Sequence, residues 1–163
     1  YGDHREAPVF IQSFEVSNLQ YLRSRTKMRL VQLLSANGKP YDFQVSGDAR
    51  GYQDLARSPG LDFVKSYADG IGAHTQLIVP TDGRRLLPPT ELIKEAHARG
   101  LPVHGWTFRA ENQFLPSELA LGTELAAKGD MAAQLRAFLE AGMDGFFTDH
   151  PDLAREALNT MTP

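Results

Sequence analysis

The 163 residues include 42% hydrophobic and 23% charged residues and carry a net charge of −3. This composition suffices for one ordinary core, and we expect residues 1–163 to form a single unit. The negative net charge gives no sign of a basic surface that would bind nucleic acid or an anionic membrane. No stretch of the sequence reaches the ~18 apolar residues that a membrane span needs. The absence of cysteine excludes disulfides and thiolate metal sites.

The first part of the chain predicts two buried strands with a helix between them. Residues 8–14 (PVFIQSF) and 28–35 (MRLVQLLS) are apolar runs rich in strand-forming residues. Ser17 can cap the intervening helix, one face of which carries Leu19 and Leu22.

The middle of the chain repeats this alternation after a polar, glycine-containing stretch at 36–51, which predicts a long loop. A helix is expected from about Pro59, followed by a short strand and irregular structure at 69–79. Thr90 can cap the next helix and Gly100 can end it.

The last part predicts two more strands. Residues 101–108 (LPVHGWTF) form the first, and 109–129 is a long connection that we expect to contain a short helix at 118–127. Asp130 can cap the following helix, and the strand at 143–149 (MDGFFTD) precedes a final helix.

This order predicts an α/β fold of parallel strands with crossover helices. An open doubly wound sheet and part of a (β/α)₈ barrel both fit it, because length excludes only a complete barrel of typically ~250 residues. Parallel strands carry chemistry at their carboxyl ends. The residues at those positions are Gln12, Phe14, Glu15, Gln32, His74, Trp106, Phe108, Arg109, Thr148, Asp149 and His150.

Each of these residues also has a purely structural explanation. Gln12 and Gln32 can satisfy hydrogen bonds inside the core, the aromatic rings can be core residues, and Asp149 can be a helix N-cap. The histidines have no partner at a spacing diagnostic of a metal site, and no nucleophile or phosphate-loop motif occurs. The residues by themselves therefore identify no reaction.

Five stretches in sequence resemble the glycerophosphodiester phosphodiesterase family, especially its larger bacterial periplasmic-type members: VFIQSFE, RLVQLL, YADGIGAH, GLPVHGWTFR and AGMDGFFTDHPDLA. Together they cover about residues 8–157. The resemblance implies a (β/α)₈ TIM barrel, of which this chain is the carboxyl-terminal half.

The resemblance also implies hydrolysis of glycerophosphodiesters to glycerol 3-phosphate and an alcohol, with a divalent metal, Ca or Mg. The family's His-Arg-Gly, Glu-x-Asp, His-Asp and Glu-x-Lys motifs do not occur here. In DHREAP, Glu6 stands where the family has glycine, so His4 and Arg5 receive no catalytic role. We assign no catalytic residue and no metal ligand, expect both outside this chain, and expect the chain alone to be inactive.

By the same resemblance, four residues are expected to bind substrate. Gln12 would donate a hydrogen bond to a substrate oxygen, and Phe14, Trp106 and Phe108 would pack against the glycerol carbons or the leaving group. Trp106 and Phe108 are expected on one side of their strand, with Thr107 opposite. The Trp106 indole N–H would offer one further donor.

Three further features complete the expectations. The loop at 109–129 would overhang the site and select the head group, and Arg109 would either meet the substrate charge or remain solvated. Glu15 is expected to have a structural or supporting role.

An isolated half-barrel would expose apolar side chains and unpaired strand edges. We therefore expect it to associate with the missing amino-terminal half or with another copy of itself. The chain starts at Tyr1 rather than methionine, which fits a removed leader or a piece of a longer chain. The resemblance suggests a periplasmic or secreted protein, with a cytoplasmic location left open. The alternative function is a non-catalytic α/β half-barrel that serves in binding or assembly.

Overall fold

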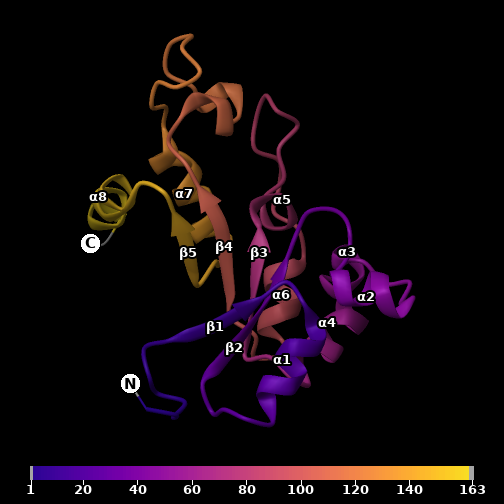
Figure 1. Ribbon diagram of the computed structural model, residues 1–163. Coiled ribbons are helices and arrows are strands. Elements are labelled where there is room, and N and C mark those ends of the chain that lie inside the picture. Colours follow the sequence, from indigo (N-terminus) through magenta and orange to yellow (C-terminus); the bar gives the residue numbers. More distant parts are fainter. Residues whose placement is uncertain (1, 162–163) are drawn as a thin grey trace.

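The computed structural model describes residues 2–161, which form a curled sheet with helices packed along it (Figure 1). The sheet contains five parallel strands in the order β1-β2-β3-β4-β5, so β1 and β5 are its edges. Their bounds are β1 Phe10–Ser13, β2 Arg29–Leu34, β3 Gly70–His74, β4 Val103–Phe108 and β5 Gly145–Thr148. The predicted α/β fold, with parallel strands curled as in half of a TIM barrel, is confirmed.

Helical segments connect every pair of neighbouring strands. Their bounds are α1 Val16–Arg23, α2 Tyr41–Ser46, α3 Tyr52–Leu55, α4 Ser58–Lys65, α5 Thr75–Ile78, α6 Leu92–His97, α7 Met131–Glu140 and α8 Pro151–Met161, with 3₁₀ turns η1 Asn112–Phe114 and η2 Ser117–Leu119. No helix among residues 2–161 is long and apolar enough to cross a membrane.

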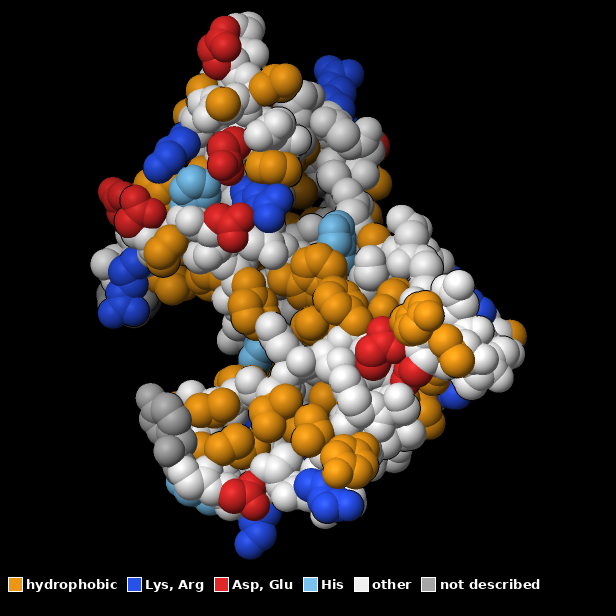
Figure 2. Space-filling view, viewed as in Figure 1, with side chains coloured by type: hydrophobic (Ala, Val, Ile, Leu, Met, Phe, Trp, Pro, Cys, Tyr) orange, Lys and Arg blue, Asp and Glu red, His pale blue; other side chains and the backbone are white. Residues whose placement is uncertain are grey.

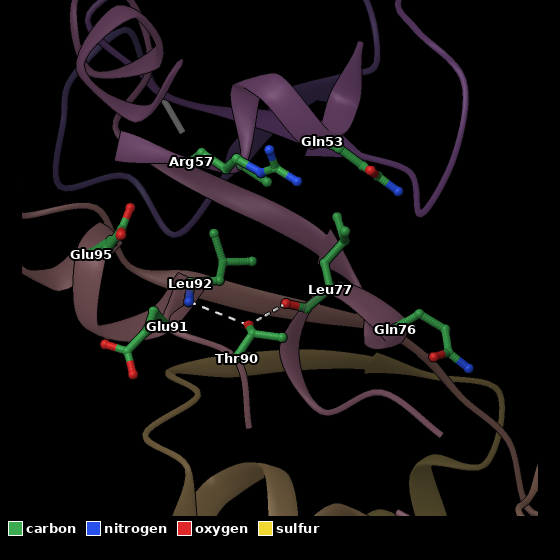
Figure 3. A pocket seen from close by; sticks show the side chains of 9 residues that line it. Gln53, Arg57, Gln76, Leu77, Thr90, Glu91, Leu92 and Glu95 are labelled. Atoms are coloured by element: carbon green, nitrogen blue, oxygen red, sulfur yellow. Dashed lines mark hydrogen bonds between the residues drawn. The ribbon is translucent and has the colours of Figure 1, made fainter. Parts of the chain in front are cut away.

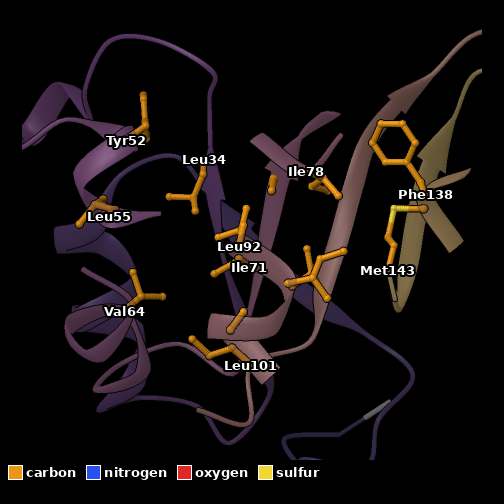
Figure 4. Close-up of a cluster of buried hydrophobic side chains, with 14 of the residues drawn as sticks. Leu34, Tyr52, Leu55, Val64, Ile71, Ile78, Leu92, Leu101, Phe138 and Met143 are labelled. Carbon is orange, nitrogen blue, oxygen red and sulfur yellow. The ribbon is translucent and has the colours of Figure 1, made fainter. Parts of the chain in front are cut away.

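The core lies between the outer face of the sheet and the helices (Figure 4). Leu34 of β2 and Ile71 of β3 are fully buried there and pack with helix residues such as Leu55 and Leu92. The inner strands β2 and β3 are buried at nearly every position, on both faces of the sheet, which explains why their sequences are continuous apolar stretches. The other face of the sheet is concave and carries the candidate site.

Most predicted helix ends are confirmed. The Asp130 carboxylate accepts a hydrogen bond from the Ala133 amide at 2.8 Å and caps α7. Gly100, the predicted end of α6, adopts a φ of 65°, and Gly142 adopts a φ of 99° just after α7; glycine reaches such values without strain. The prediction for Thr90 is wrong, because Glu91 is the N-cap residue of α6, although the Thr90 hydroxyl accepts a 3.3 Å hydrogen bond from Leu92 N.

The predictions for Ser17 and for the loop at 36–51 are wrong. Glu15, not Ser17, is the N-cap residue of α1, and the predicted loop contains the helix α2. The Glu15 carboxylate accepts hydrogen bonds from the amides of Tyr41 and Asp42, at 3.2 and 2.6 Å, and so satisfies the first turn of α2. The contact spans 26 residues or more, and no local pattern reveals it.

The helix predicted at 118–127 is also wrong, apart from the 3₁₀ turn η2, whose residues Ser117–Leu119 overlap its start. The Asn112 side-chain amide donates hydrogen bonds to the carbonyl groups of Leu121 and Glu124, at 3.0 and 2.8 Å. Its side-chain oxygen accepts a 3.0 Å hydrogen bond from Leu121 N. A helix would need these backbone groups for its own hydrogen bonds, so the segment instead folds as an irregular loop around Asn112.

Candidate functional site

A pocket of about 400 Å³ lies on the concave side of the sheet, at the carboxyl ends of its strands. It is lined by Gln12, Phe14, Leu33, Trp106, Thr107, Phe147, Thr148 and Asp149. Three of the four residues predicted to bind substrate, Gln12, Phe14 and Trp106, therefore line one pocket. We call it the strand-end pocket.

The concave face around this pocket is unusually apolar for an exposed surface. Phe10, Phe14 and Phe147 expose 41%, 38% and 38% of their surface. Figure 2 shows hydrophobic side chains gathered around a hollow in the molecule. Exposed apolar patches of this kind mark binding grooves or interaction surfaces.

The backbone at Phe14 is held in place by a buried glutamine. Gln32 is fully buried, and its side-chain nitrogen donates hydrogen bonds to the carbonyl groups of Ser13 and Phe14 at 3.3 and 3.0 Å. Its side-chain oxygen accepts a 2.8 Å hydrogen bond from the Tyr67 hydroxyl, and burial raises the pKa of Tyr67. Of the two explanations open for Gln32, the structure selects the interior one.

Trp106 forms the opposite wall of the pocket. Its ring meets Phe14 edge-to-face at a centroid distance of 5.6 Å and His74 at 4.9 Å. The indole N–H donates a 2.8 Å hydrogen bond to the Gly72 carbonyl. The expected free donor is therefore already used, and Trp106 contributes an apolar surface in a fixed orientation.

Phe108 does not lie in the pocket, and the prediction that it shares a face with Trp106 is wrong. The pairing of β4 with β5 shifts register between Gly105 and Phe108, which breaks the alternation of the strand. Phe108 is 1% exposed, and its ring packs against Phe138 and Phe146 at 5.0 and 5.7 Å. It is a core residue on the helix side of the sheet.

Arg109 is partly exposed, with 38% of its side-chain surface accessible, and it is paired with a carboxylate of this chain. Its Nε donates a 2.6 Å hydrogen bond to the Asp149 carboxylate, and its guanidinium lies 4.7 Å from the centroid of the Phe114 ring. His150 makes a second link of 3.0 Å to Glu111. These two pairs fasten the start of the 109–129 loop to the turn after β5.

Two groups on the amino-terminal segment lie far from this edge of the sheet. Arg5 forms a 2.6 Å ion pair with Asp69, which directly precedes β3 and therefore lies at the opposite end of the strands. His4 pairs with Glu6 at 3.5 Å. That neither His4 nor Arg5 has a catalytic role stays a prediction.

The described residues do not fit a metal site. Within residues 2–161 no three histidine or carboxylate side chains come close enough to hold a metal ion. The prediction that the ligands of a Ca or Mg ion lie outside this chain stays a prediction.

A separate cavity of about 230 Å³ lies within the helix layer, between the region of α3 and helix α6 (Figure 3). Thr90 links two segments that line this cavity. Its hydroxyl donates a hydrogen bond to the Leu77 carbonyl at 2.6 Å and accepts one from Leu92 N. This cavity is on the other side of the sheet from the hollow face, so it is not part of the candidate site.

A third cavity, of about 370 Å³, adjoins the strand-end pocket and shares Trp106 and Thr107 with it. Sequence reasoning missed one of its residues, Gln134, which is 8% exposed. A signal was present: Gln134 lies three residues after Met131 and four before Phe138, on the buried face of α7. A polar residue in an apolar helical stripe needs a partner or a function.

Comparison with known proteins identifies the family of the chain. Residues 2–153 match the model of the glycerophosphoryl diester phosphodiesterase family. Glycerophosphodiester phosphodiesterase GDPD6 of Arabidopsis thaliana is 33% identical over 148 residues, which make up 90% of this chain and 37% of that protein.

A crystal structure from Silicibacter pomeroyi DSS-3, described as a glycerophosphoryl diester phosphodiesterase, superimposes on this chain with a TM-score of 0.57. It is 21% identical in sequence, so the likeness supports the fold alone, and it covers 93% of this chain and 38% of that chain. The chain thus spans less than two fifths of either relative. From the family match over nearly its whole length, the chain belongs to the glycerophosphoryl diester phosphodiesterase family.

Proposed function

We propose that this chain forms the substrate-binding wall of an enzyme that hydrolyses glycerophosphodiesters to glycerol 3-phosphate and an alcohol. The observation that carries the proposal is the convergence of Gln12, Phe14 and Trp106 in one pocket at the carboxyl edge of a family barrel sheet. In parallel α/β barrels this edge is where substrates bind.

Each of the three side chains suits part of such a substrate. The Gln12 amide lies at the exposed end of β1 and donates to a phosphoryl or hydroxyl oxygen. The rings of Phe14 and Trp106, held edge-to-face, pack against the glycerol carbons. Phe108, buried behind the sheet, has no part in this proposal.

We also propose that the catalytic groups come from strands outside this chain. The sheet has five strands and the family barrel eight, so about three more strands would close it against β1 and β5. Those strands would supply the proton-transferring histidines and the carboxylates for a divalent Ca or Mg ion, which neutralises phosphate charge. A periplasmic or secreted location of the complete enzyme is proposed from the family resemblance alone.

Reconstitution tests the proposal. The purified chain is mixed with an amino-terminal fragment of a family member that carries the His-Arg-Gly and Glu-x-Asp motifs, with Ca or Mg present. We expect release of glycerol 3-phosphate from glycerophosphocholine only when both parts and the metal are present, and loss of activity with a chelator. Turnover by the purified chain alone, in proportion to its concentration, would contradict the proposal that the catalytic groups lie outside this chain.

The same experiment addresses the alternative of a non-catalytic binding or assembly module. That alternative is favoured by the exposed Phe10, Phe14 and Phe147 on the hollow face, which a second copy can cover. It predicts a monodisperse homodimer that the amino-terminal fragment does not disrupt. Formation of an active one-to-one complex would decide against it.

A further inference from the structure

Gln32, Asn112 and Gln134 are the buried amide side chains of the described chain, with 0%, 7% and 8% exposure. The first two are engaged in hydrogen bonds, Gln32 with three backbone carbonyl groups and a hydroxyl, and Asn112 with the backbone of the 109–129 loop. The Gln134 side chain makes no hydrogen bond to any residue in 2–161. The fully buried side-chain N and O atoms without a partner in residues 2–161 belong to Arg29 and Glu95 and not to Gln134. The Gln134 amide is therefore open to the cavity that it lines, where it is available to a hydrogen-bonding group from outside the chain.

Gln134 lines the 370 Å³ cavity at the carboxyl ends of β3 and β4. The cavity is enclosed by segments after these two strands, including Gln113 and Phe114 from the start of the 109–129 loop. Because the cavity and the strand-end pocket share Trp106 and Thr107, a ligand can occupy both. The cavity is thus placed to receive whatever extends from a molecule in the strand-end pocket.

The cavity wall is rich in uncharged hydrogen-bonding groups. His74 Nδ1 accepts a 3.1 Å hydrogen bond from Gln76 N, so the neutral ring carries its proton on Nε2. Burial lowers the pKa of His74, which keeps the ring neutral near pH 7. The Thr107 hydroxyl and the Gln113 amide also make no side-chain hydrogen bond within the described residues.

The charges around the cavity oppose a cationic ligand. No carboxylate lines it, and its one cation, Arg109, is paired with Asp149 outside the lining. The guanidinium of Arg109 covers Phe114 at 4.7 Å, so this ring is not available to a second cation. Neutral donors and acceptors without a carboxylate suit a ligand that carries several hydroxyl groups and no charge.

We propose that this cavity binds the alcohol part of the substrate when that alcohol is a neutral polyol, such as glycerol or an inositol. The Gln134 amide is the residue that selects it, through hydrogen bonds to hydroxyl groups. This inference rests on the proposed function, because the strand-end pocket must hold the glycerophosphoryl part.

Trp106 provides a direct readout, because it is the single tryptophan of the chain and lines both pockets. The chain is titrated with glycerol, myo-inositol and choline, while Trp106 fluorescence and the Gln134 side-chain amide signal in NMR spectra are followed. We expect both signals to respond to the two polyols and not to choline at equal concentration. An equal or stronger response to choline overturns the proposal.

Substitution of Gln134 separates recognition from folding. Gln134→Leu removes an unpaired amide, so we expect at least tenfold weaker polyol binding with unchanged or higher thermal stability. The matched control is Asn112→Leu, which removes a fully bonded amide of similar burial and should lower stability. A stability loss in Gln134→Leu equal to that of the control, or unchanged polyol binding, overturns the proposal.

Gln113→Ala, on the exposed loop, gives a second variant that leaves the core intact and should weaken polyol binding. The titrations need no catalysis, so their outcome is separate from that of the proposed function. A polyol response without activity in the reconstituted enzyme would count against the function alone. Reconstituted activity that prefers a choline ester over a glycerol ester would count against the polyol site alone.

Discussion

Gln32 shows how one buried side chain can position a residue of the candidate site by hydrogen bonds to its backbone alone. Its amide fixes the carbonyl groups of Ser13 and Phe14, and Phe14 then faces Trp106. The local sequence placed Phe14 and Gln12 correctly at the end of a strand. It left the role of Gln32 open, because the Tyr67 hydroxyl that completes its bonding lies 35 residues away.

Replacing Gln32 tests this arrangement. Gln32→Leu leaves the Tyr67 hydroxyl and the loop carbonyl groups without partners, so we expect the free energy of unfolding to fall by roughly 2–4 kcal/mol. Urea denaturation measures the loss. The double variant Gln32→Leu/Tyr67→Phe should recover part of it, because both polar partners are then removed. No recovery would mean that the hydrogen bond at 2.8 Å is not the source of the effect.

At the scale of elements, the helices with local end signals were predicted and those built by distant contacts were not. Asp130, Gly100 and Gly142 mark helix ends by their own chemistry. The helix α2 depends instead on the Glu15 carboxylate, and the irregular loop at 109–129 depends on Asn112.

The N-cap of α7 can be tested alone. Asp130→Ala removes the acceptor of the Ala133 amide, so we expect a loss of about 1 kcal/mol in unfolding free energy. Asp130→Ser keeps a capping oxygen and is the matched control. Because α7 carries Gln134 into the cavity, the alanine variant should also broaden the Gln134 amide signal in NMR spectra. Equal stability of the two variants would show that the cap contributes nothing.

At the scale of the whole molecule, the open concave face decides the behaviour of the isolated chain. Phe147 lies on the edge strand β5 and is 38% exposed at the hollow. Burying such a ring against a partner contributes about 1.5–3 kcal/mol, which corresponds to roughly a tenfold or larger change in affinity.

Self-association of the purified chain should therefore depend on this face. We expect Phe147→Asp to raise the dissociation constant of self-association at least tenfold, which sedimentation velocity measures as a shift toward monomer. Val45→Asp is the control, because Val45 is 70% exposed on α2, away from the strand-end pocket. The same shift in both variants, or in neither, would show that association does not use the hollow face.

The sequence by itself determined the order of the five strands, the parallel sheet, the family, and the position of Gln12, Phe14 and Trp106 near strand ends. These follow from local periodicity, capping chemistry and short motifs, which need no knowledge of distant partners. Only the tertiary structure decided that Phe108 faces the core and that Gln134 lines a cavity without a partner. Both depend on contacts between segments far apart in the chain. The orientation of Phe108 depends on the register shift between β4 and β5. The position of Gln134 depends on the packing of α7 beside β4.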